Sequence, residues 1–140
     1  MENFFEYYNP NPTAKVFKNG KPKAWTKEDN AVRVICMVTG KSWEDAYDML
    51  TEEAKKLSDM PSSKEVVAGL LAKEGYMPVS VGKPKTGERR PTVAEFCSAH
   101  KNGKFILNIA SVMVPVSSGR FLDTEDRSDS SVYSWFEHIG

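Results

Sequence analysis

Two cysteines and two histidines are the side chains whose types could carry nucleophilic or metal chemistry in this chain of 140 residues. Cys97 and His100 have the Cys-x-x-His spacing of half a zinc site, but tetrahedral zinc needs four ligands and no second pair is visible. A serine triad of His100, Ser111 and Asp123 is a second arrangement, although no nucleophile-elbow sequence surrounds Ser111. His138 lies near the end of the chain, where residues commonly fray. We therefore expect neither a metal nor a cofactor.

The composition suits one compact domain, with 40% hydrophobic and 27% charged residues. Nineteen basic and nineteen acidic residues cancel, which makes nucleic acid the least favoured partner. Cys36 and Cys97 are the only cysteines, too few for a disulfide framework. No apolar run approaches the roughly 20 residues that span a bilayer, and no signal peptide opens the chain. These observations predict no membrane contact and a reducing cytoplasm.

Two stretches are locally basic, residues 15–27 and residues 83–90. Charged loops of this kind are usually solvated. The functional alternative is a contact surface for an acidic partner.

Capping signals predict three successive helices after an extended arm over residues 1–25. Prolines in Asn-Pro-Asn-Pro disfavour helix in the arm, whose aromatic residues either pack on their own domain or dock onto a partner. Apolar residues then recur at helical spacing. The first helix is expected to be capped by Thr26 with Asp29 and to end at Gly40. The second is expected to be capped by Ser42 with Asp45 and to end near Leu57. The third is expected to be capped by Ser62 with Glu65 and to end at Gly75.

The second half has the character of an antiparallel sheet interrupted by one short helix. Thr92 with Glu95 predicts a capping box for a helix to about Ala99. Ser117-Ser118-Gly119 reads as a hairpin turn, and Pro115 predicts an edge or bulged strand. The expected strands are Met77–Val81, Phe105–Ile109, Val112–Val116, Arg120–Leu122 and Val132–Phe136. Helices first and strands afterwards indicate an α+β domain over residues 26–140.

Five segments, in order along the chain, resemble a small papain-like cysteine peptidase family that is common in bacteriophages. They include the Tyr-Tyr-Asn-Pro-Asn-Pro of residues 7–12 and the Asp-Met-Pro-Ser-Ser of residues 59–63. The others are residues 27–35, 92–100 and 122–126. The resemblance implies a papain-like fold, with N-terminal helices packed on a C-terminal antiparallel sheet.

The resemblance places Asn30 at the position of the catalytic cysteine, near the start of the first helix. It places Ser111 or Val112 at the position of the histidine, and only the acidic residue, Asp123, is retained. An amide forms no thiolate to attack a carbonyl, and neither Ser111 nor Val112 is a general base near neutral pH. Without a histidine to orient, Asp123 is expected to cap a turn or to pair with Arg120 or Arg127.

We therefore expect an inactive peptidase that acts in the host bacterial cytoplasm by protein–protein binding and inhibits a host or defence protein. One alternative is a residual cysteine hydrolase that uses Cys36 or Cys97. Cys36 follows Asn30 by six residues, about 600° of helix, and so faces roughly 120° away from it. Another alternative is a phage structural or assembly protein. The expected binding residues are Tyr7, Tyr8, Asn30, Arg33, Asp123 and Glu125.

Overall fold

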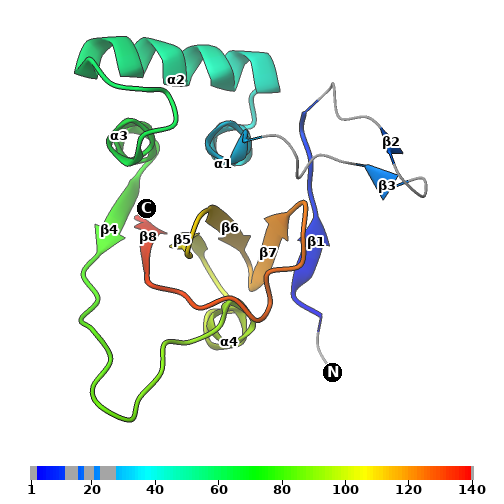
Figure 1. Ribbon diagram of the computed structural model, residues 1–140, viewed down its shortest axis with the longest axis vertical. Helices are drawn as coiled ribbons and strands as arrows, with labels where there is room; N and C mark the ends of the chain where they lie inside the picture. Colours follow the sequence, from blue (N-terminus) through cyan, green and yellow to red (C-terminus); the bar gives the residue numbers. More distant parts are fainter. Residues whose placement is uncertain (1–2, 12–15, 18–20, 23–27, 140) are drawn as a thin grey trace. The chain divides into compact units, whose positions relative to one another are not determined.

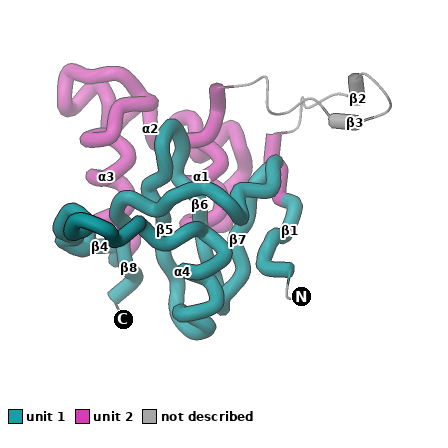
Figure 2. Tube along the Cα trace, turned by 60° about the horizontal axis from the view of Figure 1, so that its bottom comes forward, with its two compact units in different colours: residues 1–7, 75–140 teal, residues 8–74 magenta. Residues whose placement is uncertain are grey.

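The computed structural model describes residues 3–11, 16–17, 21–22 and 28–139. The chain forms two compact units, shown in different colours in Figure 2. Unit 1 comprises residues 1–7 and 75–140, and unit 2 comprises residues 8–74. The predicted arm of residues 1–25 thus contributes to both units. The combination of helices and one large sheet confirms the predicted α+β class.

Unit 2 is built on three helices and a small two-stranded sheet (Figure 1). A continuous stretch of α1 is buried, and α2 and α3 each bury one apolar face. Their bounds are Asn30–Thr39 for α1, Trp43–Leu57 for α2 and Lys64–Lys73 for α3. Strands β2 (Val16–Phe17) and β3 (Lys21–Pro22) pair antiparallel.

The start of α2 follows the predicted capping pattern. The Ser42 side chain accepts a hydrogen bond from the Asp45 N–H, at 3.1 Å. In α3 the cap is Ser63, which accepts from the Val66 N–H at 3.3 Å, so the prediction of Ser62 is wrong by one residue. Two adjacent serines offer the same side-chain acceptor, and the sequence alone did not distinguish them.

The start of α1 differs from the prediction. The helix begins at Asn30, and its N-cap residue is Asp29, which makes no side-chain capping bond. The predicted capping pair of Thr26 and Asp29 is therefore wrong, although Thr26 itself lies outside the described residues. The Asp29 carboxylate is used elsewhere, as shown below. Gly40, in the left-handed conformation with φ of 73°, ends α1 as predicted.

A buried carboxylate lies where α2 and α3 pack together. Glu53 is only 8% exposed and pairs with Lys73 across a distance of 2.8 Å. A Cβ atom added to Gly69 of α3 would lie 2.8 Å from Glu53 Oε2. Glycine at this position therefore gives the Glu53 carboxylate its space.

Unit 1 contains a six-stranded sheet with the order β1-β7-β6-β5-β8-β4 (Figure 1). All neighbouring pairs are antiparallel except β1 and β7. The strands are β1 (Phe5–Tyr7), β4 (Tyr76–Val79), β5 (Lys104–Asn108), β6 (Met113–Ser117), β7 (Arg120–Asp123) and β8 (Ser134–His138). Each predicted strand is present, with ends shifted by at most two residues.

The five strands predicted from the sequence pair antiparallel, as expected, and β1 adds a strand to this sheet, parallel to β7. Phe5 lies opposite Phe121, and Tyr7 lies opposite Asp123. The Phe121 N–H donates to the Phe4 carbonyl at 2.8 Å, and the Phe5 and Phe121 rings are 5.4 Å apart. Parallel strands need a long connection, and the segment between these two provides one. This strand comes from the aromatic arm, where the sequence pattern predicted only extended chain.

Pro115 lies in β6, which is an internal strand between β7 and β5, so the prediction of an edge strand is wrong. Its local consequence is nevertheless visible. The Ser118 N–H and the Val112 carbonyl both make hydrogen bonds to the β5 side of β6. Successive residues of an antiparallel strand bond alternately to the two neighbouring strands, so the Pro115 nitrogen faces β7. The pairing of β6 with β7 ends at Val116 and Phe121, so β7 does not need a donor from Pro115.

One face of the sheet is covered by α4 (Val93–Ala99), which carries the predicted capping box of Thr92 and Glu95. Phe96 and Cys97 of α4 are buried in one cluster with strand residues that alternate along β5 and β6, and with Phe121 of β7. The hairpin turn between β6 and β7 has positive φ at Ser118 (52°) and Gly119 (77°), which suits the twist of the flanking strands.

Candidate functional site

Asn30 is the first residue of α1, which confirms that it lies at a helix N-terminus. Backbone N–H groups and the positive end of the helix dipole meet at such a position, and they stabilise a thiolate. The amide of Asn30 carries no ionisable group that this field could activate. The location is thus suited to a nucleophile, while the side chain is not one.

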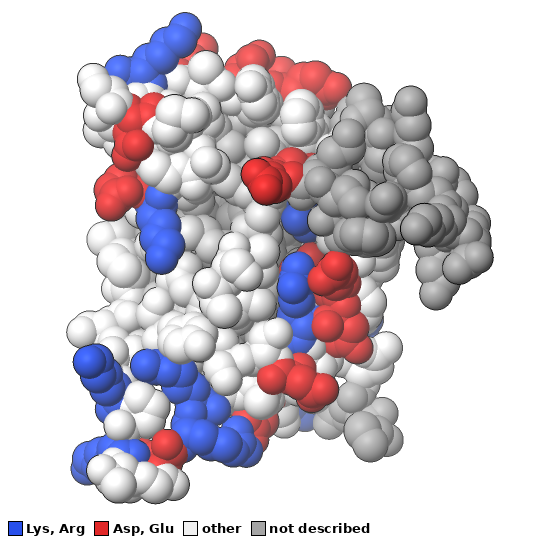
Figure 3. Space-filling view, viewed as in Figure 1, with Lys and Arg blue, Asp and Glu red and all other residues white. Residues whose placement is uncertain are grey.

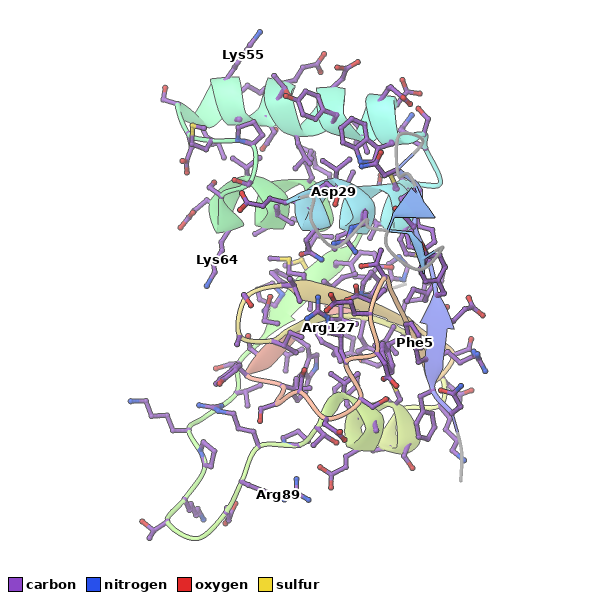
Figure 4. All side chains as sticks on the ribbon, turned by 45° about the vertical axis from the view of Figure 1, so that its right-hand side comes forward. Phe5, Asp29, Lys55, Lys64, Arg89 and Arg127 are labelled. Carbon is purple, nitrogen blue, oxygen red and sulfur yellow. The ribbon has the colours of Figure 1, made fainter. Side chains whose placement is uncertain are left out.

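The residue before Asn30 is Asp29, labelled in Figure 4, which is the centre of a buried polar cluster. Asp29 is 7% exposed and accepts three side-chain hydrogen bonds. Arg33 Nε donates to Oδ1 at 3.1 Å, while Asn11 Nδ2 and Trp43 Nε1 donate to Oδ2 at 3.0 and 3.1 Å. Asn11 and Arg33 are buried as well. This carboxylate therefore joins the segment before α1, α1 itself and the start of α2.

Sequence reasoning missed the role of Asp29, because the capping-box pattern assigned its carboxylate to the helix backbone. The Asp-x-x-x-Arg spacing of Asp29 and Arg33 was an available signal, since residues four apart lie on the same face of a helix. Arg33, predicted as a binding residue, is only 6% exposed. Its side chain holds the Asp29 cluster together.

The two thiols are buried and weakly acidic. Burial and, after it, the negative charge of Asp29 together raise the pKa of Cys36 to about 11. Burial likewise raises the pKa of Cys97 to about 11. A catalytic cysteine needs the opposite shift, towards the thiolate at neutral pH. This environment argues against both residues as nucleophiles of a residual hydrolase.

Tyr8, another predicted binding residue, lies in the same electrostatic environment as Cys36. Its half-buried phenol has a pKa raised to about 12, first by burial and then by Cys36, while Arg33 acts in the opposite direction. The phenol therefore stays protonated at physiological pH. Within unit 2 the structure groups Tyr8, Arg33 and Cys36 through these interactions.

His100 is held by packing within unit 1. Its ring stacks on Phe96 with centroids 3.9 Å apart, and Nδ1 lies 2.9 Å from the Phe96 carbonyl oxygen. Phe105 contacts the ring from another side, edge to face. Cys97 is fully buried. The Cys-x-x-His spacing is thus accounted for by packing of α4 on the sheet.

Ser111 and Asp123 occupy different environments in unit 1. Ser111 is exposed in the turn between β5 and β6, closed by the bond from Ile109 N–H to Val112 C=O. Asp123 ends β7 and is 2% exposed. The Asp123 carboxylate accepts hydrogen bonds from Thr124, Glu125 and Arg127, while the His100 ring packs on Phe96.

Asp123 caps a turn and pairs with an arginine, as predicted for a carboxylate without a histidine to orient. Its Oδ1 accepts from the Thr124 N–H at 2.6 Å, and its Oδ2 lies 3.3 Å from Arg127 Nε. Arg127, labelled in Figure 4, also pairs with Glu125 at 3.3 Å. Tyr7 lies opposite Asp123 in the β1–β7 register and is 52% exposed.

The predicted binding residues thus divide between the two units. Tyr8, Asn30 and Arg33 belong to unit 2, and the other three, Tyr7, Asp123 and Glu125, belong to unit 1. Over the part of the chain that the structure describes, no three His, Cys, Asp or Glu side chains group as metal ligands. Among the same residues, no helix has the length and apolar character needed to cross a membrane.

Comparisons of this chain with family models, with curated proteins and with solved structures gave no match.

Proposed function

We propose that this protein is a papain-like domain without peptidase chemistry, which acts in a bacterial host by binding another protein. The observation that carries the proposal is Asn30, an amide that begins α1 where a nucleophile would gain most from the helix N-terminus. The resemblance to phage peptidases supports the bacterial setting. A host or defence protein is the target class that we propose.

The chemistry of the other candidate groups supports the same proposal. A substitute nucleophile would need a lowered pKa, whereas burial raises the pKa of Cys36 and of Cys97 to about 11. A substitute base would need an accessible nitrogen that faces a nucleophile, whereas the His100 ring is packed between Phe96 and Phe105. Binding requires none of these activated groups.

The test is affinity capture of the tagged protein from a bacterial host lysate in moderate salt, with mass spectrometry of the retained proteins. We expect one host protein in stoichiometric amount, retained equally by the double variant Cys36→Ala/Cys97→Ala. Capture of nothing beyond what an unrelated tagged protein retains would overturn the proposal. So would hydrolysis of a fluorogenic peptide library that disappears in the double variant.

A further inference from the structure

The loop between β4 and α4 is the most exposed basic segment that the structure describes. It covers residues 82–91, and every residue from Gly82 to Arg89 is exposed. Figure 3 shows lysine and arginine side chains gathered at the lower left, where Figure 1 draws this loop. We refer to these ten residues, together with Tyr133, as the basic loop surface.

The end of this loop is firmly attached to unit 1. Arg89, labelled in Figure 4, makes a bidentate pair with Glu95, at 2.6 and 2.7 Å. This pair lowers the pKa of Glu95 to about 2, chiefly through the hydrogen bonds from Arg89. The Val132 N–H donates to the Pro91 carbonyl at 2.9 Å. The loop is therefore presented from a fixed base.

Arg90 and Tyr133 form a cation–π contact at this base, with the guanidinium carbon 4.6 Å from the ring centroid. The Tyr133 N–H donates to the Asn108 carbonyl at 2.9 Å, which fixes the Tyr133 backbone to β5. Tyr133 is nevertheless 44% exposed. A tyrosine with a fixed backbone and an exposed ring is a common anchor in protein interfaces.

The charge of the loop is not cancelled by its neighbours. Glu95 neutralises Arg89. The remaining charged residues of the loop are three cations, Lys83, Lys85 and Arg90, and one carboxylate, Glu88. Among the described residues, neither Lys83 nor Lys85 forms an ion pair within 4.0 Å. An approaching acidic segment would therefore meet available positive charge.

We propose that the basic loop surface binds an acidic segment of a partner protein, with Lys83 and Lys85 as the charge contacts and Tyr133 as the apolar anchor. This inference rests on the proposed function and names its contact surface. An acidic protein segment fits better than nucleic acid. Single-stranded nucleic acid is bound by a long basic groove with several stacking aromatics, whereas this surface has one exposed tyrosine.

The test is selection of random 16-residue peptides, displayed on phage, on the purified full chain. We expect the selected peptides to be enriched in Asp and Glu. A synthetic copy of the best peptide should bind the Lys83→Gln/Lys85→Gln variant roughly threefold to tenfold more weakly, because two exposed charge contacts are lost. Both lysines are exposed, so the variant should keep its fold, which circular dichroism checks.

The matched control is Lys55→Gln/Lys64→Gln, which removes the same charge from two exposed lysines of unit 2, labelled in Figure 4. This control should bind the peptide as tightly as the original chain. Peptides without acidic enrichment, or equal weakening in both variants, would overturn the inference. Tighter binding of an oligo-dT strand than of the peptide, lost in the loop variant, would reassign the surface to nucleic acid.

Failure of this inference is distinguishable from failure of the proposed function. A host protein captured equally by the original chain and by Lys83→Gln/Lys85→Gln would keep the binding function and exclude this surface. Loss of the captured protein in the loop variant alone, with retention in the unit 2 control, would support both.

Discussion

Trp43 donates its indole N–H to the Asp29 carboxylate over 3.1 Å, which ties the start of α2 to the residue that precedes α1. Arg33 and Asn11 donate to the same carboxylate, so one buried acid organises the helical end where Asn30 lies. The N-terminus of α1 is therefore held in place by a buried polar cluster.

Replacing Asp29 with Ala should destabilise the protein by about 3 kcal/mol, because it removes the ion-pair partner of buried Arg33 and the acceptor for two further donors. Urea unfolding followed by circular dichroism measures the effect. The control is Asp48→Ala, at an exposed position of α2, which should change the free energy of unfolding by less than about 0.5 kcal/mol. Equal effects of the two substitutions would contradict a structural role for the cluster.

Gly119→Ala should destabilise unit 1 by about 2 kcal/mol. Its φ of 77° disfavours a side chain, and an added Cβ would lie 3.2 Å from Lys101 Cα and 3.4 Å from the Cys97 carbonyl oxygen. Thermal unfolding gives the comparison with Gly82→Ala. At Gly82 an added Cβ meets nothing within 4 Å, so that variant should be close to neutral. A neutral Gly119→Ala would show that the β6–β7 turn has another conformation.

Thr92→Ala should cost about 1 kcal/mol, since Thr92 Oγ1 accepts the Glu95 N–H in the capping box of α4. Thr92→Ser keeps the oxygen and should recover most of the loss. Chemical denaturation of the three proteins at one pH and salt concentration measures the differences. Similar losses in both variants would mean that the methyl group, not the cap, stabilises this region.

The buried thiols predict slow alkylation at neutral pH. With a pKa of about 11 for Cys36 and for Cys97, the thiolate fraction near pH 7 is negligible. Iodoacetamide should modify the native protein at least tenfold more slowly than the protein unfolded in urea, as followed by mass spectrometry. Fast single-site labelling of the native protein would favour the residual-hydrolase alternative.

The same shifts predict a loss of stability at alkaline pH. Folding raises the pKa of each thiol from 9.0 to about 11, so the folded state favours the protonated form. This contribution is complete below pH 9 and is lost as the pH rises from 9 to 11. The free energy of unfolding should therefore fall across that range, and less steeply in the Cys36→Ala/Cys97→Ala variant. Identical slopes would contradict the burial of the thiols.

Local rules predicted much of the fold. The caps at Ser42 and Thr92 and the ends at Gly40 and Gly75 follow from chemistry within a few residues, and the structure has all four. The position of the Pro115 strand in the sheet was harder to predict, because the missing N–H of a proline matters only where the neighbouring strand needs a hydrogen-bond donor. Whether it does depends on the register of β7, which no local pattern specifies.

The candidate site was predictable in position but less so in its contacts. Asn30 at a helix start and Asp123 in a turn with Arg127 both follow from nearby residues. Asp29 was misassigned because its partners Asn11 and Trp43 are far from it in sequence. The exposure of the loop ending at Arg89 and Arg90 was expected, whereas the contact of Arg90 with Tyr133 joins distant segments.

The pairing of β1 with β7 also affects how unit 1 is assembled during synthesis. Phe5 and Phe121 are more than one hundred residues apart, yet they lie opposite each other in the sheet. At roughly 5 to 20 residues per second, the ribosome takes about 6 to 23 seconds to add the segment between them. Throughout that interval the aromatic side chains of β1 lack their partner strand. Translation speed over the intervening helices therefore sets how long this nascent segment is open to chaperones or to misassembly.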